Sequence, residues 1–299
     1  MLFRKLTIDA VNRATTTQDG AAGKSVNVAK VLKALGERPL ALGFLGGDRG
    51  EELRSILRER GVEMDFVPIA VRTRQCITVI DEAAGTHTEL VEESQPVSAS
   101  AYTELVARVR NHCPKSRAVI MSGSLTPGGP ANFYFQCTQL GHEHGALTLV
   151  DAQGPPLLEA LKAKPALVKP NRTELAATAG RELSDEADML KAIRELSGRG
   201  AERVVVTAGK EPVLAFDGKR LWRVMAPRLT ALNPIGSGDA FTAGLVWRLL
   251  RGDDLGEACR WACAAGAANA LTLMAGELEK ADVEKLVADV KLEPFAQGA

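Results

Sequence analysis

The chain has 299 residues, which is enough for one large α/β domain with an appendage or for about two smaller domains. Hydrophobic residues make up 45% and charged residues 25% of the sequence, so it can bury a sizeable core and is not a disordered tail protein. Its 37 basic residues balance 37 acidic ones, and aromatic residues are only 4%, which excludes a general surface for nucleic acid or for an anionic membrane.

The five cysteines contain no C-x-x-C pair, which argues against both a disulfide framework and a thiolate zinc site. No apolar run approaches the roughly 20 residues that span a bilayer, and residues 1–5 carry no signal-peptide core. We therefore expect a reduced protein of the cytoplasm with no membrane partner.

The regular elements alternate between helices and short buried strands. Apolar residues recur at helical spacing over residues 28–35, and a buried strand is expected over residues 40–45. Four further apolar runs, each separated by room for a covering helix, lie at residues 118–121, 147–150, 166–168 and 204–206. A hairpin is expected at residues 212–224, and helices from 238 to 290 precede a frayed tail. This alternation predicts a parallel α/β sheet built from right-handed crossovers.

Two stretches depart from the alternation and have the character of hairpins, residues 3–20 and residues 73–91. A partly polar sheet beside an α/β core is exposed on one face, so it covers a site, pairs with another chain, or does both. We expect a β lid from segments 1–20 and 71–95, and a core from segments 21–70 and 96–299.

Residues 233–239 read Asn-Pro-Ile-Gly-Ser-Gly-Asp and precede an apolar helical run, so the two glycines make a sharp turn at a helix N-terminus. The amides of Gly236, Ser237 and Gly238 are expected to converge on an anion there, helped by the helix dipole. Asp239 repels an anion unless it has a proton to accept, which indicates a general base for a hydroxyl that attacks a phosphoryl group. The alternative is an ordinary helix with an acidic residue in its first turn.

A second segment, residues 21–30, reads Ala-Ala-Gly-Lys-Ser-Val-Asn-Val-Ala-Lys. Residues 23–25 match the end of a P-loop, but the first glycine of that motif is absent and no strong strand leads into it. Gly23 instead lets the backbone approach a ligand, Lys24 offers a charge to a phosphate, and Asn27 offers an amide to sugar hydroxyls.

Together the two segments resemble the signature regions of the PfkB (ribokinase-like) carbohydrate kinases, and further motifs of that family lie in order between them. They are Thr73-Arg74 with Ile77-Thr78, residues 122–128, the run from Lys169 to Glu174, and Thr207-Ala-Gly209. The resemblance extends from about Arg4 to Gly276 and is closest to the branch of 1-phosphofructokinases, tagatose-6-phosphate kinases and minor-type 6-phosphofructokinases. It implies a ribokinase-like three-layer α/β core with a mostly parallel central sheet and a small β-sheet lid.

The resemblance also implies the chemistry of the turn. Asp239 would be the catalytic base, and the amides of Gly236, Ser237 and Gly238 would stabilise the phosphoryl group in transfer from ATP. No residue is assigned as a direct metal ligand.

Asn171 and Glu174 match an N-x-x-E element that organises Mg²⁺ and the nucleotide phosphates, with Glu174 acting through water. The alternative is structural, because Asn is a good N-cap and Glu three residues later completes a capping box. The remaining residues that the resemblance assigns to ATP are Lys169, Thr207, Gly209 and Asn269.

For the acceptor, Lys24 and Arg74 are the expected partners of a phosphate that the substrate already carries, since a neutral sugar does not need them. Arg72 competes with Arg74 for this role, and the Thr-Arg pairing favours Arg74. The other residues expected to bind the substrate are Gly23, Asn27 and Ser122.

We therefore expect an ATP- and Mg²⁺-dependent kinase of fructose 1-phosphate, fructose 6-phosphate or tagatose 6-phosphate, which pairs through its lid in a homodimer. The alternatives are a kinase of a neutral sugar or nucleoside, which Lys24 and Arg74 disfavour, and a sugar-phosphate sensor without catalysis, which Asp239 disfavours.

Two features depart from the family pattern. The usual Gly-Gly-Lys-Gly is here Ala22-Gly23-Lys24-Ser25, so the backbone must accommodate a Cβ at two positions. A first core strand with an Asn-Pro element and an acidic residue for the sugar is also missing before Met1. We expect the natural chain to start upstream and to encode them.

Overall fold

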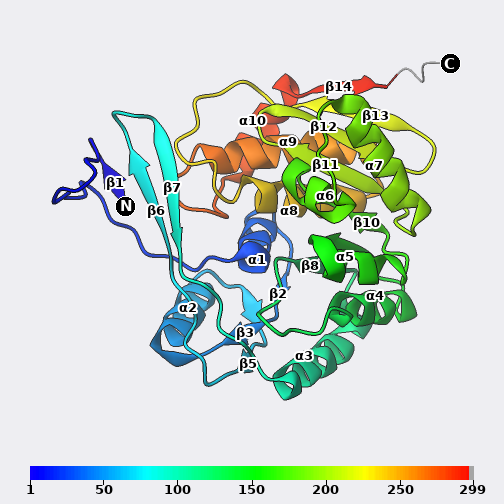
Figure 1. The fold of residues 1–299 in the computed structure, drawn as a ribbon, viewed down its shortest axis with the longest axis horizontal. Helices are drawn as coiled ribbons and strands as arrows, with labels where there is room; N and C mark the ends of the chain where they lie inside the picture. Colours follow the sequence, from blue (N-terminus) through cyan, green and yellow to red (C-terminus); the bar gives the residue numbers. More distant parts are fainter. Residues whose placement is uncertain (296–299) are drawn as a thin grey trace.

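The computed structural model describes residues 1–295, which form a central sheet covered by helices (Figure 1). The sheet has seven strands in the spatial order β14-β13-β12-β11-β10-β9-β8. They are β8 (Ala118–Ser122), β9 (Leu147–Asp151), β10 (Leu167–Val168), β11 (Val204–Ala208), β12 (Glu211–Phe216), β13 (Leu221–Met225) and β14 (Lys291–Pro294). Strands β8 to β11 run parallel, and the pairings from β11 to β14 are antiparallel. The α/β fold class expected from the sequence is confirmed.

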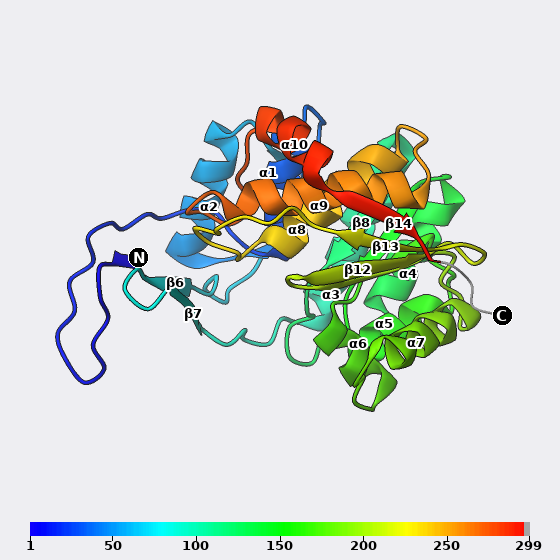
Figure 2. The same cartoon turned by 90° about the horizontal axis from the view of Figure 1, so that it is seen from above.

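Helices cover both faces of this sheet, as Figure 2 shows. One face carries α1 (Lys24–Ala34), α8 (Ser237–Leu249), α9 (Leu255–Ala270) and α10 (Lys280–Leu286). The other carries α3 (Ala99–His112), α4 (Phe133–Glu143), α5 (Gly154–Leu161), α6 (Arg172–Ala179) and α7 (Glu186–Gly198). Successive strand residues face opposite sides, so Leu149 packs in the cluster of α8 and α9 and its neighbour Val150 in the cluster of α4 and α5. Burial on both faces explains why these strands are short continuous apolar runs.

A smaller unit lies beside the sheet and contains α2 (Gly47–Glu59) with four two-residue strands. These are β2 (Leu40–Ala41), β3 (Phe44–Leu45), β4 (Glu63–Met64) and β5 (Val67–Pro68). The single strand expected over residues 40–45 is therefore wrong, because β2 pairs with β4 and β3 with β5. Backbone hydrogen bonds from Asp65, Val67 and Ile69 still run along the whole segment, so it stays extended along one edge.

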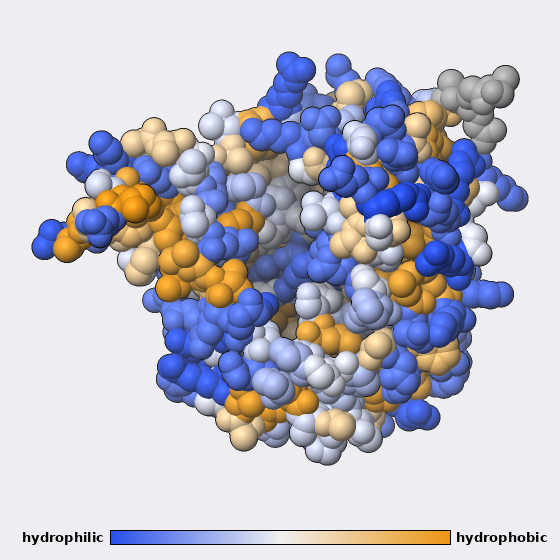
Figure 3. All heavy atoms as spheres, viewed as in Figure 1, coloured by the Kyte–Doolittle hydropathy of each residue, from blue (hydrophilic) through white to orange (hydrophobic). Residues whose placement is uncertain are grey.

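A separate three-stranded sheet, here called the lid sheet, consists of β1 (Leu2–Phe3), β6 (Cys76–Asp81) and β7 (Thr86–Val91). The β6–β7 hairpin agrees with the sequence, whereas residues 4–20 form mainly loop. Figures 1 and 2 show this sheet extending away from the core, and Figure 3 shows apolar surface over it. In β7 the side chains of Leu90 and Val91 are 54% and 48% exposed.

The C-terminal segment differs from expectation. Residues Lys291–Pro294 form the edge strand β14 against β13, with Leu292 packed on the core, so the expected fraying is wrong there. Residues 296–299, also part of that expected tail, lie outside the described residues. Two 3₁₀ helices, Cys113–Lys115 and Val287–Asp289, follow α3 and α10. Among residues 1–295, no helix combines the length and the apolar character needed to cross a membrane.

Candidate active site

The turn at residues 233–239 leads directly into α8. Gly236 precedes the helix with a φ of 83°, and a Cβ at this position would lie 2.8 Å from the Cβ of Ala275. Glycine is therefore required both by the backbone conformation and by the close approach of a second loop. Within residues 1–295, the N–H groups of Gly236 and Gly238 have no protein acceptor, whereas that of Ser237 donates to a carbonyl of the turn at 3.2 Å. The helix N-terminus thus presents two free donors to an anion.

Two buried asparagines brace this turn. Asn233 donates from Nδ2 to the carbonyl of Leu273 at 2.9 Å, and its Oδ1 accepts from the N–H of Ile235 at 3.0 Å. Asn269 donates from Nδ2 to the carbonyl of Ile235 at 3.0 Å, and its Oδ1 accepts from the N–H of Gly276 at 2.8 Å. The bracing by Asn233 was missed, although an Asn that opens a Pro-Gly turn is the signal of a side chain that binds its own backbone. The expected place of Asn269 beside adenine stays a prediction.

Asp239 lies in the first turn of α8 with 7% of its surface exposed. Its Oδ2 accepts a hydrogen bond of 2.7 Å from Nδ2 of Asn27 on α1, whose own Oδ1 is buried without a partner. Burial raises the pKa of Asp239 to about 6; the Asn27 hydrogen bond opposes the rise, Asp151 adds to it, and Lys169 and Lys24 also oppose it. A carboxylate with a pKa near neutrality is well matched to proton transfer.

Asp151 ends β9 and connects several of the predicted site residues. Its Oδ2 lies 3.1 Å from Nζ of Lys169 and accepts hydrogen bonds of 3.3 Å from the hydroxyls of Ser122 and Thr242. Its Oδ1 is buried without a hydrogen-bond partner and lies 3.7 Å from Nζ of Lys24. The sequence reasoning missed Asp151 and Thr242. Asp151 directly follows an expected strand, at the carboxyl edge where open α/β sheets bind ligands, and that position was the available signal.

Lys24 connects residues 21–30, here called the acceptor segment, with the N-x-x-E element of residues 171–174. Its Nζ lies 2.9 Å from Oε1 of Glu174, and although burial opposes its charge, Asp151 and Glu174 outweigh burial and raise its pKa. The other oxygen of Glu174 accepts from the N–H of Asn171, whose side chain accepts from the N–H of Glu174 in return. The capping box is therefore present, and it leaves one carboxylate oxygen of Glu174 facing the site.

The two segments expected to contact ATP lie side by side. Thr207 at the end of β11 pairs with Asn171 through an isolated parallel bridge. Gly209 follows in the exposed turn before β12, with a φ of 63°. Lys169 immediately precedes this region, and its side chain is only 4% exposed. The structure thus brings Lys169, Asn171, Glu174 and Thr207 to one edge of the sheet.

The residues expected to bind the acceptor substrate lie in two separate places. Gly23 caps α1 with a φ of 128°, and nothing lies within 4 Å of a Cβ built there. Arg74 is exposed and, in the described part of the chain, forms no hydrogen bond or ion pair, so the structure does not join it to the cluster around Asp151. Arg72 instead binds both oxygens of Asp48 at 2.6 Å. This contact leaves Arg74 as the uncommitted cation of the pair.

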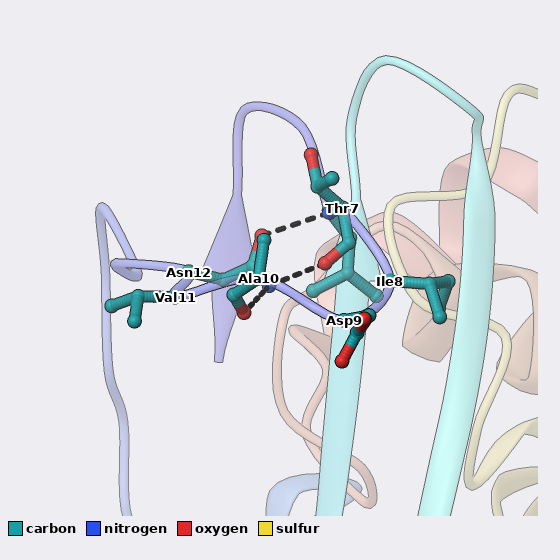
Figure 4. A pocket seen from close by; sticks show the side chains of 7 residues that line it. Thr7, Ile8, Asp9, Ala10, Val11 and Asn12 are labelled. Carbon is teal, nitrogen blue, oxygen red and sulfur yellow. Dashed lines mark hydrogen bonds between the residues drawn. The ribbon is translucent and has the colours of Figure 1, made fainter.

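Two of the recesses in the described part of the surface differ in character. Figure 3 shows a hollow near the centre of one face, where Figure 1 draws α1 and α8. A second pocket lies within the N-terminal loop and is lined by residues 6–12, where Asn12 holds both the N–H and the carbonyl of Thr7 at 2.8 Å (Figure 4). It contains none of the predicted site residues. In residues 1–295, no group of three acidic, His or Cys side chains is arranged to hold a metal ion.

Comparisons with known proteins identify the family and the fold. Residues 4–281 match the model of the pfkB family carbohydrate kinases. Phosphofructokinase-2 from Escherichia coli is 29% identical over 96% of this chain and 93% of its own, with a TM-score of 0.87. The same enzyme in complex with fructose-6-phosphate gives a TM-score of 0.84. A possible 1-phosphofructokinase of Thermotoga maritima, 23% identical over 99% of this chain and 95% of its own, shares the fold with a TM-score of 0.90. The chain therefore belongs to the PfkB family of carbohydrate kinases.

Proposed function

We propose that this sugar kinase transfers the γ-phosphoryl group of ATP to a hydroxyl of a ketohexose monophosphate and forms the bisphosphate. The observation that carries the proposal is a buried carboxylate, Asp239, beside the free amides of Gly236 and Gly238. This combination suits phosphoryl transfer, since charge grows on the phosphoryl oxygens while the attacking hydroxyl loses a proton.

Asp239 is the proposed base. Asn27 occupies its Oδ2 at 2.7 Å, which leaves Oδ1 to accept the proton of the attacking hydroxyl. The acceptor oxygen forms the new bond to the γ-phosphorus, the bond to the oxygen of the β-phosphate breaks, and ADP leaves with that electron pair. The amides of residues 236–238 bind the phosphoryl oxygens throughout, and Ser237 must release its turn carbonyl to take part.

The nucleotide is proposed to lie along the edge formed by Lys169, Asn171, Glu174, Thr207 and Gly209. Mg²⁺ accompanies the phosphates in such reactions and neutralises their charge. The buried Oδ1 of Asp151, which has no hydrogen-bond partner, would face a metal that keeps most of its water, whereas Oε1 of Glu174 would have to exchange its contact with Lys24 to do so.

Recognition of the acceptor's phosphate is assigned to Lys24 and Arg74, and of its hydroxyls to Gly23, Asn27 and Ser122. The Lys24 side chain is 39% exposed and Arg74 has no partner within residues 1–295, so both are accessible to a phosphate. Escherichia coli phosphofructokinase-2 has been crystallised with fructose-6-phosphate, which supports this substrate class.

The test is ADP release with fructose 1-phosphate, fructose 6-phosphate, tagatose 6-phosphate, fructose, ribose and adenosine as acceptors, and with the Asp239→Asn variant as control. We expect turnover with at least one ketohexose phosphate and little with the neutral acceptors. Preference for a neutral sugar or nucleoside would favour the second kinase hypothesis. Tight binding of a sugar phosphate without ADP release would favour a sensor.

The lid sheet, with segments 1–20 and 71–95, is proposed to close over the core and to pair with its copy in a homodimer. Leu90 and Val91 lie on opposite faces of β7 and both are exposed, and cover for either apolar side chain by a second copy supports this pairing. A tetrameric inhibited form is known for Escherichia coli phosphofructokinase-2. Light scattering at micromolar protein should give a dimer that Leu90→Lys weakens, and a strictly monomeric wild type would contradict the proposal. The five cysteines are free thiols, which fits the proposed cytoplasmic location.

A further inference from the structure

Lys30 on α1 is a buried lysine that the proposed reaction does not use. Its side chain is 2% exposed. Nζ donates to the carbonyl of Ala21 at 2.8 Å and to the carbonyl of Ala275 at 2.7 Å. An ammonium group so far from water is costly unless its donors are satisfied, and here two of the three are committed to backbone.

The two carbonyls belong to segments more than 250 residues apart, and both segments reach the candidate active site. Ala21 lies just before Gly23 and Lys24 in the acceptor segment. Ala275 and Gly276 form a turn, here called the wedge turn. Lys30 therefore links the start of the acceptor segment to the wedge turn by hydrogen bonds.

The wedge turn fits tightly between groups that perform the proposed chemistry. A Cβ on Gly236 would lie 2.8 Å from the Cβ of Ala275, and a Cβ on Gly276 would lie 2.7 Å from the Cα of Asn27. The N–H of Gly276 also donates to Asn269, which holds the turn before α8. A displacement of the wedge turn therefore moves the phosphoryl-binding amides, and it moves Asn27, which binds Asp239.

The positive charge of Lys30 lies near the carboxylate of Glu277, which also pairs with Arg60. Glu277 lies 3.9 Å from Nζ and also pairs with Arg60 of the neighbouring unit at 2.5 Å. Burial lowers the pKa of Lys30 to about 8, with Arg60 acting in the same direction, and Glu277 and Asp239 opposing it. Lys30 is therefore charged at neutral pH although it is buried. An apolar side chain at this position would avoid the free-energy cost of removing the ammonium group from water.

We infer that Lys30 is a positioning residue of the kinase: it holds the wedge turn against the acceptor segment, and thereby sets the amides of residues 236–238 and the Asn27–Asp239 pair in register. The inference rests on the proposed function for the identity of the groups that are positioned. It does not place Lys30 in contact with either substrate.

The experiment compares Lys30→Ala, Lys30→Met and Lys30→Arg with Lys33→Ala, which alters an exposed lysine of the same helix. We expect Lys30→Ala and Lys30→Met to lower kcat by roughly 10- to 100-fold, because misplacement by about 1 Å costs this much, while the two KM values change less than about threefold. Lys30→Arg and Lys33→Ala should retain most of the rate. Propylammonium should restore part of the kcat of Lys30→Ala by occupying the vacated space, and tetramethylammonium, which has no N–H donor, should not.

Hydrogen exchange supplies a readout that needs no substrate. In Lys30→Met, the amides of residues 235–239 and 274–277 should exchange faster, while those of α3, on the opposite face of the sheet, should not change. If the wild type phosphorylates none of the acceptors and this exchange pattern still appears, the proposed function fails and the structural link remains. If the wild type is active, an unchanged kcat in Lys30→Ala or Lys30→Met overturns the inference. So does a loss of rate that neither arginine nor propylammonium restores, or failure of both neutral variants to fold, since Lys30 then serves the whole fold instead of the site.

Discussion

Asp239 is the residue on which the proposed chemistry depends most directly. Its replacement by Asn keeps the shape of the side chain and removes the ability to accept a proton. We expect Asp239→Asn to lower kcat by about 10² to 10⁴, with binding of nucleotide and sugar phosphate nearly unchanged. Steady-state kinetics and calorimetric titration measure the two quantities.

The control for this substitution is Asp289→Asn, which makes the same chemical change at an exposed position after α10. Turnover of Asp239→Asn close to that of the wild type would remove Asp239 from the role of base. Loss of ligand binding in step with loss of turnover would assign it to binding.

Lys24 and Arg74 are expected to act on the phosphate that the acceptor carries. Lys24→Ala and Arg74→Ala should each raise KM for the acceptor by about tenfold or more and leave KM for ATP about constant, because a charge-assisted hydrogen bond of roughly 1.5–3 kcal/mol is lost. Initial rates measured with each substrate varied in turn separate the two effects. Lys24 also contacts Glu174, so an increase confined to ATP would reassign it to the nucleotide.

Arg72→Ala is the matched comparison for Arg74→Ala. Arg72 binds Asp48 at 2.6 Å and is two residues away, so its loss should affect the acceptor much less. Equal effects of the two substitutions would mean that the segment, not the cation of Arg74, determines the acceptor's affinity.

At the scale of elements, the clearest test concerns the turn before α8. Gly236→Ala forces a left-handed backbone on a residue with a Cβ and places that Cβ 2.8 Å from Ala275. We expect a stability loss of more than about 1 kcal/mol together with a large loss of kcat, because the wedge turn and the free amides must both move. Urea unfolding and steady-state kinetics measure these losses.

Gly85→Ala separates the effect of the left-handed backbone from the effect of the close contact between the new Cβ and its neighbour. Gly85 in the hairpin between β6 and β7 has a φ of 62°, but nothing lies within 4 Å of a Cβ built there. This variant should lose only about 1 kcal/mol and keep its kcat. A Gly236→Ala variant that behaves like Gly85→Ala would show that the turn is not tightly packed.

The elements differ in how far local sequence predicts them. The turn at residues 233–239, α1 and the β6–β7 hairpin follow from glycine placement and from apolar spacing, which are local signals. The two-residue strand β1 pairs with β6 nearly 80 residues later, and β14 is a four-residue edge strand with a polar sequence. Neither has a local pattern, because its partner supplies the hydrogen bonds that define it.

The site shows the same division. Asp239, Lys24 and Glu174 belong to recognisable motifs, and the structure brings them within one network. Asp151 belongs to no motif, and its importance appears only when the end of β8, the loop after β10 and helix α8 place Ser122, Lys169 and Thr242 around it. The sequence likewise could not show whether Asn27 binds the sugar or the proposed catalytic base Asp239, because it gives the residue type but not its partner.

At the scale of the whole molecule, Asp239 links the site to the stability of the fold. Its pKa is about 6 in the folded protein, against an ordinary value of 3.8. Between about pH 4 and pH 6 the folded state therefore binds more protons at this residue than the unfolded chain does, so its contribution to stability falls as pH rises through that window. Above pH 6 the ionised Asp239 carboxylate lowers the free energy of unfolding by a constant amount, on the order of 3 kcal/mol.

We therefore expect Asp239→Asn to be more stable than the wild type at pH 7 and to lose that advantage toward pH 4. Urea unfolding midpoints measured across this range provide the test, and Asp289→Asn should follow the wild type at every pH. A constant difference between Asp239→Asn and the wild type would mean that the carboxyl group titrates normally. In the wild type, kcat/KM should rise with pH and level off above about pH 6, since the base must be ionised.

The wedge turn has a consequence for how this active site can change over generations or by design. A single methyl group at Gly236 or Gly276 would collide with the opposing loop or with α1. Three segments distant in the sequence, around residues 27, 236 and 276, therefore have to vary together. A chimera that imports α8 and its turn from a relative, in order to alter the sugar accepted, should succeed only when the wedge turn and the start of α1 are transplanted with it.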